Sequence, residues 1–408
     1  MPTLRLLHGF RAVFTGSTAG TLHDAAIAIQ GDRVTWVGEY ADAPAADERI
    51  DCSGLLALPG LVDCHTHAVF AGSRADEFEA RLAGANYTDI LEAGGGILST
   101  VRETRAATEE ELAETLSARL DAMLLNGVTT VEVKSGYGLS PAAEHKMLRA
   151  AKQPKHPVSV RRTFLGAHAV PAELRGDRAA YVQQVIDEQL PLCADDADQI
   201  DVYCDRGAFS VEEAEQILAA GKAAGLGLRI HAEQVAHTGA AALGARLGAA
   251  SADHLEQIDD QGVEAMAQAG TVAVLLPGAM LYLKDHAPPV DKLRNAGVPM
   301  AVATDFNPGS SPVRDLLSCA TLACLTMGLT VDEALLGITR NAAKVLNVPD
   351  IGWIGPGSRA DLAIFAPPPG EAATLPVLVQ YLGGHQAEHV LKNGEFVVRH
   401  RQRCAGQA

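Results

Sequence analysis

The chain has 408 residues, a length that favours one large domain with a smaller module, and its 48% hydrophobic content suits a substantial core rather than disorder. Asp and Glu number 50 against 33 Lys and Arg; the net charge of −17 argues against nucleic acid as a partner, because this surface repels phosphates. No apolar run of about 18 residues occurs, so we expect neither export nor a membrane span. The 7 cysteines are odd in number without Cys-x-x-Cys spacing, which predicts reduced thiols in a cytoplasmic protein.

Short strands and turns are predicted at both ends of the chain. Gly31-Asp32 and Asn393-Gly394 each separate two apolar runs, and such dipeptides are hairpin signals. Two β-rich ends that enclose a different middle predict one small β module, assembled from residues 1–57 and 358–408.

Strands and helices alternate in the middle of the chain, residues 58–357. The strand candidates are 61–65, 129–133, 160–165, 199–203, 227–230, 250–253, 271–275 and 300–303. Helical patterns cover 109–126, 141–152, 178–190, 211–224, 238–247, 261–269, 290–295 and 312–327, with an extra helix from Thr330 to near Asn347. This repetition predicts an α/β fold, a (β/α)8 barrel. A doubly wound sheet is the alternative, but the first strand lacks the Gly-rich phosphate turn.

Polar side chains follow strand after strand of the predicted barrel. These are His65 and His67, Lys134 to Gly138, His168, His231 to Gln234, His254, and Asp305 to Asn307. Functional groups of such barrels sit at the C-terminal ends of the strands, so we expect these side chains on one rim.

Three histidines and one aspartate of this rim form a candidate metal site: His65, His67, His231 and Asp305. Imidazole nitrogens with one carboxylate suit zinc, and iron nearly as well. We expect Asp305 both to contact the metal and to accept a proton from water; an ordinary turn residue is the alternative. His254 would hydrogen-bond the attacking water or polarise a substrate carbonyl. Its alternative is a structural histidine held by Asp253 or Glu256.

Longer motifs carry a family resemblance over nearly the whole chain. The segment from Pro59 to His67, with His231, His254 and Asp305, resembles the amidohydrolase superfamily, whose members combine a (β/α)8 barrel with a small β-sandwich. The similarity narrows to the imidazolonepropionases through six further motifs: Phe70-Ala71-Gly72-Ser73-Arg74, Glu77-Phe78, Gly94-Gly95-Gly96-Ile97, Ser135-Gly136-Tyr137-Gly138-Leu139, Gly166-Ala167-His168-Ala169 and Asp305-Phe306-Asn307-Pro308-Gly309-Ser310.

The resemblance implies a reaction and a set of roles. That family opens the ring of 4-imidazolone-5-propanoate with water, which gives N-formimidoyl-L-glutamate in the third step of histidine degradation. By resemblance the four metal ligands would be those named above, holding one divalent or trivalent ion, zinc or iron. Substrate would contact Arg74, Tyr137, His168, Gln234, Asn307, Gly309 and Ser310. Each also has an ordinary interpretation as a loop, turn or buried residue. A homodimer would be unsurprising in this superfamily.

Two positions refine the expected mechanism. Gln234 stands where some members are thought to carry a carboxylate; a neutral amide is a poor base, which leaves proton transfer to Asp305 and His254. Lys134 is similar to the bridging lysine of two-metal relatives, but segment 199–205 contains no lysine, so we expect one metal. The rival hypotheses are a heterocycle deaminase of the same fold and a non-catalytic protein that binds a metal or ligand.

Overall fold

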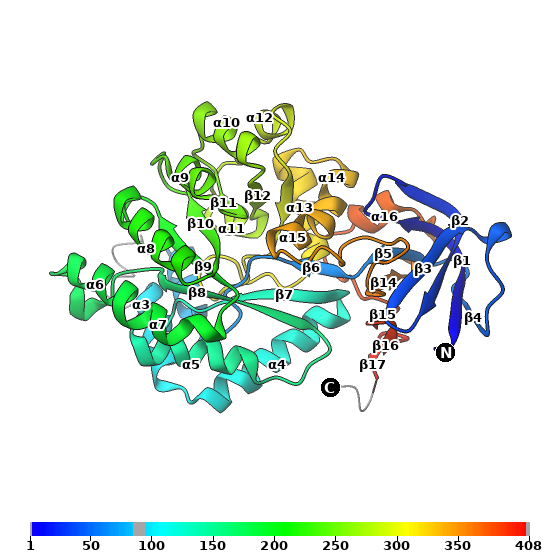
Figure 1. Ribbon diagram of the computed structural model, residues 1–408, viewed down its shortest axis with the longest axis horizontal. Helices are drawn as coiled ribbons and strands as arrows, with labels where there is room; N and C mark the ends of the chain where they lie inside the picture. The colour runs from blue at the N-terminus through cyan, green and yellow to red at the C-terminus, as the bar shows by residue number, and fades with distance from the viewer. Residues whose placement is uncertain (1, 85–94, 405–408) are drawn as a thin grey trace.

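Eight parallel strands form the barrel sheet of the computed structural model, which describes residues 2–84 and 95–404 (Figure 1). They are β6 (Leu61–Asp63), β7 (Val128–Lys134), β8 (Ser159–Ala167), β9 (Gln199–Cys204), β10 (Gly227–Ala232), β11 (Ser251–His254), β12 (Val272–Leu275) and β13 (Met300–Val302). The sheet closes just beyond β6 and β13, where the amide of Asp305 donates to the His65 carbonyl at 3.0 Å and the amide of His67 to the Phe306 carbonyl at 2.9 Å. The predicted barrel is confirmed, and each predicted strand is present.

Most predicted helices cover the outside of the barrel (Figure 1). They are α4 (Glu109–Leu125), α5 (Pro141–Lys152), α8 (Val211–Ala223), α9 (Ala240–Leu247), α10 (Asp260–Ala269), α12 (Val290–Asn295) and α13 (Leu316–Met327). Helix α13 begins later than predicted, because the Asp315 side chain caps it by accepting from the Ser318 amide at 3.2 Å.

Two predicted helices are interrupted. The helix expected over 178–190 is α6 (Arg178–Gln184), a π-turn (Val185–Gln189) and α7 (Leu190–Cys193), because Pro191 has no amide hydrogen to continue the α-helical ladder. The single helix expected from Thr330 is wrong: α14 (Val331–Gly337) and α15 (Arg340–Val345) stand in its place. The break exposes the carbonyl of Ile338, which accepts from the Val62 amide of the barrel at 2.9 Å.

Four α-helices within residues 2–84 and 95–404 were not predicted. Helices α1 (Ala75–Leu82), α3 (Ile97–Ala106) and α11 (Pro277–Leu283) come from the barrel part of the chain, and α16 (Leu375–Gln380) precedes the last strands. The first three lack a side-chain cap at the N-terminus, so the capping signal is missing from their sequences, although α11 begins with Pro277. Gly94 of the glycine motif lies outside the described residues.

The strands of the two chain ends form a second sheet, at one end of the molecule (Figure 1). It contains β1 (Leu4–Phe14), β2 (Thr21–Gln30), β3 (Arg33–Glu39), β4 (Glu48–Asp51), β5 (Leu56–Pro59), β14 (Leu362–Phe365), β15 (His389–Lys392), β16 (Glu395–Arg399) and β17 (Gln402–Arg403). Both predicted hairpins are present, β2–β3 and β15–β16. Leu7 and Ile27 share one hydrophobic cluster with Ile364 and Leu391, so strands from both ends build a common core.

The chain crosses from the terminal sheet into the barrel at Gly60, between β5 and β6. The Gly60 amide donates to the Asp361 carbonyl at 2.7 Å, and a Cβ at this position would overlap the Thr129 side chain. Glycine at this crossing therefore sets where β6 begins, and with it the position of the two histidines that follow. The domain boundaries near 58 and 357 stay a prediction. Within 2–84 and 95–404, no helix has the length and apolar character needed to span a membrane.

Candidate active site

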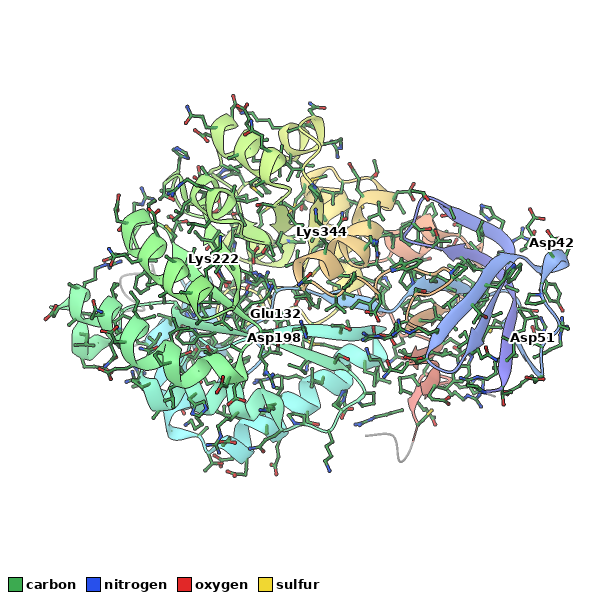
Figure 2. The ribbon with its side chains drawn as sticks, in the orientation of Figure 1. Asp42, Asp51, Glu132, Asp198, Lys222 and Lys344 are labelled. Carbon is green, nitrogen blue, oxygen red and sulfur yellow. The ribbon has the colours of Figure 1, made fainter. Side chains whose placement is uncertain are left out.

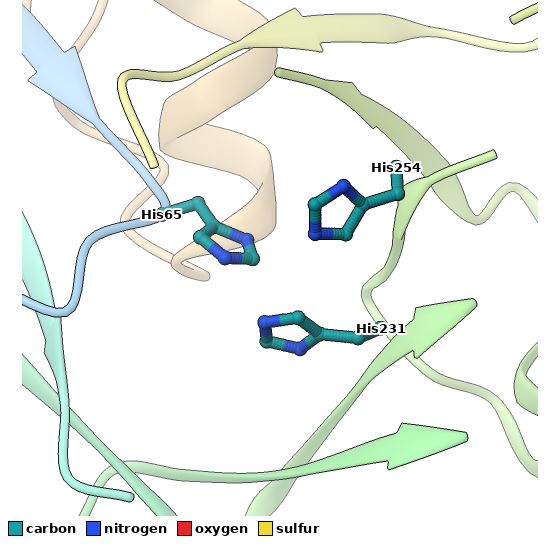
Figure 3. A group of neighbouring side chains, drawn as sticks. All are labelled: His65, His231 and His254. Carbon is teal, nitrogen blue, oxygen red and sulfur yellow. The ribbon is translucent and has the colours of Figure 1, made fainter. Parts of the chain in front are cut away.

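Buried histidines converge at the rim of the barrel. Figure 3 shows His65, His231 and His254 turned toward a common centre from three parts of the barrel. The ring centroids of His65 and His231 are 4.5 Å apart, and those of His231 and His254 are 5.5 Å apart. His67 lies 5.4 Å from His65 by the same measure. The rim predicted from the sequence thus brings all four imidazoles together.

Asp305 completes the cluster. Its Oδ1 lies 3.4 Å from the Nε2 atoms of both His65 and His67. The Nε2 atoms of His65 and His231 are buried, and neither has a hydrogen-bond partner among the described residues. Buried imidazole nitrogens without partners, beside a carboxylate, are the donor set of a transition-metal site. The residues present therefore fit a zinc or iron ion.

The other nitrogens of two of these imidazoles face carboxylates. Asp253 Oδ2 lies 2.6 Å from His65 Nδ1, and Asp201 Oδ2 lies 3.0 Å from His231 Nδ1. Asp253 accepts the Nδ1 hydrogen of His65, and the nearby carboxylate of Asp201 favours the hydrogen of His231 on Nδ1 as well, so the Nε2 lone pair of each ring is available. Burial also lowers the pKa of both imidazoles, well below the usual value for His65, so both are neutral as metal ligands must be.

Asp305 and His254 adopt unusual backbone and electrostatic states. Their φ angles are 50° and 80°, in the left-handed region that side chains other than glycine rarely adopt. Burial raises the pKa of Asp305 to about 7, against the lowering effect of His254. Burial lowers the pKa of His254, but Glu256 and Asp305 outweigh it and the net shift is upward. Of the two acids considered as structural partners of His254, Glu256 is the neighbour, at 3.9 Å, while Asp253 bonds His65.

A cavity of about 590 Å³ opens directly onto this cluster. It is lined by eleven of the predicted site residues: His67, Arg74, Tyr137, His168, His231, Gln234, His254, Asp305, Asn307, Gly309 and Ser310. His65 lies beneath its floor and is fully buried. Phe78, Arg81 and Leu82 of α1 and Tyr282 and Leu283 of α11 form the outer wall, which the sequence analysis missed along with those helices.

Arg74 is the predicted cation of this cavity. Its guanidinium is nearly buried, and its Nε and Nη2 donate to Glu77 Oε2 at 2.9 and 2.7 Å. Glu77 Oε1 accepts from the Gly96 amide at 2.9 Å, so this carboxylate ties Arg74 to the start of α3. Arg81 lies 3.7 Å from Glu77 and donates to the Gly309 carbonyl at 3.2 Å. Two arginines therefore border the cavity on this side, with one carboxylate between them.

Tyr137 and His168 are positioned by the loop after β7. The buried carboxylate of Glu144 accepts the backbone amides of Gly136, Gly138 and Leu139 at 2.7 to 2.9 Å, which holds this loop in place. The Gly136 carbonyl accepts from His168 Nδ1 at 3.0 Å. Burial lowers the pKa of His168 to about 3, so the ring is neutral. Its Nε2 is then a hydrogen-bond acceptor.

Gln234 and Asn307 differ in how their side-chain amide atoms are hydrogen-bonded. The Tyr203 hydroxyl donates to Gln234 Oε1 at 3.0 Å. Gln234 lines the cavity, and this bond engages its oxygen and not its amide nitrogen. Asn307 Oδ1 accepts the amides of Gly309 and Ser310 at 2.8 and 2.7 Å, and its Nδ2 donates to the Asp305 carbonyl at 2.7 Å. The Asn307 side chain is therefore engaged in shaping the loop.

Five charged residues lie beneath the cluster, and each is fully buried: Glu132, Lys134, Asp201, Arg229 and Asp253. The sequence analysis considered only Lys134 and Asp253 and missed the other three. Alternation was the available signal: Glu132 and Lys134 stand two residues apart on β7, and Arg229 stands two residues before His231 on β10. Side chains two apart share a strand face, so they point into the barrel.

A third cluster of possible ligands, Glu388, His389 and His400, lies in the terminal sheet. The His400 side chain is 80% exposed, and Arg401 Nε donates to Glu388 Oε2 at 3.0 Å. That carboxylate already has a cationic partner, which disfavours the cluster as a metal site.

Known proteins resemble the chain over almost its entire length. The profile of the amidohydrolase family matches residues 78–398. An imidazolonepropionase from Cereibacter sphaeroides is 48% identical over 401 residues, which cover 97% of this chain and 100% of the relative. Among solved structures, a triazine hydrolase variant superimposes with a TM-score of 0.76 at 19% identity, covering 99% of this chain and 96% of that one. Atrazine chlorohydrolase from Arthrobacter aurescens TC1, complexed with zinc, gives 0.72 at 19% identity, with 98% and 97% covered.

These structural likenesses support the barrel and terminal sheet as an amidohydrolase fold. The sequence identity to the Cereibacter sphaeroides relative is much higher than the identity to either solved structure. The chain belongs to the imidazolonepropionase family of the amidohydrolases.

Proposed function

We propose that the chain hydrolyses the cyclic amide C–N bond of 4-imidazolone-5-propanoate to give N-formimidoyl-L-glutamate. The observation that carries this proposal is a single cavity that joins the histidine–aspartate cluster to Arg74. One end of it suits hydrolytic chemistry and the other suits a carboxylate, and the substrate has an amide and a carboxylate at its two ends. The 48% identity to the Cereibacter sphaeroides imidazolonepropionase supports the same assignment.

The cofactor in this proposal is one divalent or trivalent metal ion, zinc or iron, held by His65, His67, His231 and Asp305. The free Nε2 atoms of His65 and His231 support that set, and the zinc in atrazine chlorohydrolase supports the choice of metal. When bound, such an ion supplies Lewis-acid activation of water and of the ring carbonyl.

The protein's own residues move the protons. Asp305 accepts a proton as the oxygen of water adds to the ring carbonyl carbon, and a pKa near 7 suits that exchange. His254 donates a hydrogen bond to the carbonyl oxygen as negative charge develops there. Its raised pKa favours the protonated imidazole, which is the form that donates. The C–N bond then breaks, and the proton on Asp305 passes to the departing ring nitrogen.

The remaining cavity residues select the substrate. Arg74 binds the propanoate, which gives an acidic protein a local anion site. His168 accepts a hydrogen bond from a ring N–H through its Nε2, and Tyr137 with Gln234 lines the ring. Gly309 and Ser310 form the wall opposite, on the loop that Asn307 shapes.

The proposal extends to the setting of the enzyme. We propose a cytoplasmic location, which the seven free thiols support. A homodimer is the assembly that family resemblance favours, and a measurement of molecular mass in solution tests it.

The test of the function is turnover of 4-imidazolone-5-propanoate, followed through loss of its ultraviolet absorbance. Enzyme loaded with zinc or iron should consume the substrate, and enzyme treated with a chelator should not until metal is restored. Absence of turnover by protein that contains metal would overturn the proposal.

A further inference from the structure

Five buried side chains form a chain of alternating charge beneath the candidate metal site. In order they are Asp253, Arg229, Glu132, Lys134 and Asp201. Successive nitrogen–oxygen distances are 2.6, 3.1, 2.8 and 2.8 Å, and every one of these side chains is 0% exposed. The five residues come from β7, β9, β10 and β11. We call this set the charge chain.

Each end of the charge chain contacts one of the proposed metal ligands. Asp253 faces His65 Nδ1 at 2.6 Å, and Asp201 faces His231 Nδ1 at 3.0 Å. Asp201 Oδ1 also accepts the backbone amide of His231 at 3.2 Å. The two imidazoles with free Nε2 atoms are thus connected to each other through five charged residues.

Glu132 is the centre of this arrangement. Its Oε1 is shared by Lys134 Nζ at 2.8 Å and Arg229 Nη1 at 3.1 Å. Its Oε2 accepts the backbone amide of Thr66 at 3.0 Å, and Thr66 stands between His65 and His67. Figure 2 labels Glu132 near the middle of the barrel, far from the exposed Asp42 and Asp51 of the terminal sheet. One carboxylate therefore influences the backbone or the partners of all three histidine ligands.

Stability alone gives little reason to bury five charges. Taking charges out of water costs several kcal/mol for each ion, and replacing a buried ion network by apolar residues is often neutral or stabilising. Three carboxylates against two cations leave a net charge of −1 directly under the cluster. That surplus attracts a cation, and the carboxylates of Asp253 and Asp201 face Nδ1 of His65 and His231, which leaves each Nε2 for the rim.

We propose that Glu132 is a positioning residue for the metal, acting through Lys134 and Arg229 on Asp201 and Asp253. It orients His65 and His231 and contributes to metal affinity without contacting metal or substrate. The inference rests on the metal-dependent function proposed above.

The test is metal affinity, measured on the full-length protein without substrate. E132Q removes the central charge and keeps the shape, so the affinity for Zn²⁺ in competition with a chelator should fall by about 10- to 100-fold, as for other residues that support metal ligands. The absorption spectrum of Co²⁺-loaded protein should change as well, because the ligand orientation changes. E132D, which keeps the charge, should recover part of the loss.

The matched control is K392M, which breaks a buried ion pair in the terminal sheet. Lys392 Nζ lies 2.7 Å from Asp361 Oδ2, with side chains 5% and 2% exposed. It should lower thermal stability and leave Zn²⁺ affinity unchanged. If E132Q does not fold, the double variant E132Q/K134M decides by the same measurement, because it removes one charge of each sign.

Zn²⁺ affinity within twofold of wild type in E132Q, or in E132Q/K134M where E132Q does not fold, would overturn the inference. An equal loss in K392M would do so too. Failure of the proposed function has a different signature: wild type binds metal but leaves imidazolonepropanoate unchanged, and the binding comparison still decides the role of Glu132.

Discussion

Gly309 lies against the guanidinium of Arg74, so closely that a Cβ at Gly309 would overlap Arg74 Nη1. The other two guanidinium nitrogens, Nε and Nη2, donate to Glu77. The backbone at Gly309 and the carboxylate of Glu77 therefore hold Arg74 from two sides. This placement explains how a loop far along the sequence sets the position of the proposed anion site.

Replacing Gly309 by alanine should impair substrate binding without unfolding the protein. The added methyl meets the end of a flexible side chain, so Arg74 moves and the fold stays intact. Loss of one hydrogen bond to the substrate carboxylate, about 1.4 kcal/mol, corresponds to about a tenfold rise in KM. Gly176→Ala is the control, because a Cβ there meets nothing within 4 Å. If KM is unchanged in Gly309→Ala, the position of Arg74 does not determine substrate binding.

Arg74 itself should determine the preference for an anionic substrate. Hydrogen bonds to a charged group contribute about 1.5–3 kcal/mol, so Arg74→Met should lower kcat/KM by about 10- to 150-fold with metal content unchanged. Arg74→Lys should not restore it, because an ammonium cannot reproduce two parallel hydrogen bonds. An analogue without the carboxylate gives the control rate. If wild type treats substrate and analogue alike, Arg74 is not the anchor.

Asp305 should be needed for turnover beyond any effect on metal binding. Asp305→Asn removes the proton acceptor, and loss of such a group costs about 10²–10⁴-fold in rate. The variant's metal content, measured on the same preparation, shows whether the ion is retained. Turnover within tenfold of wild type, with metal bound, would show that another group takes the proton.

Thiol titration should distinguish two classes of cysteine. Cys324 and Cys404 are partly exposed, while the other five are buried, and burial raises the pKa of Cys52 to about 12. The folded protein should therefore show two fast-reacting thiols, and the denatured, unreduced protein all seven. Five thiols or fewer after denaturation would mean that disulfides form.

The barrel was predictable because its signals are local. Most strands contain a short apolar run, and His65, His231 and Asp305 lie at or just beyond the ends of such runs. A closed barrel then brings strand ends together whatever the details of the loops. The candidate metal cluster could therefore be predicted without knowledge of any side-chain contact.

The cavity wall and the charge chain were not predictable in the same way. Helices α1 and α11 lack capping side chains, and only their positions over the barrel reveal their role. Glu132 and Asp201 are 69 positions apart, and Lys134 joins them only after β7 and β9 fold beside β8. The alternation of side chains along β7 could have placed Glu132 inside the barrel. Its ion-pair partner on another strand, Arg229, can be identified only once the sheet has closed.

The products of imidazolonepropanoate consumption test the central claim most directly. Metal-loaded enzyme is incubated with the substrate, and N-formimidoyl-L-glutamate is quantified by mass spectrometry beside an ammonia assay. Ring opening predicts N-formimidoyl-L-glutamate in an amount equal to the substrate consumed, with no ammonia released. Stoichiometric ammonia, or substrate left intact by enzyme that holds its metal, would contradict the account.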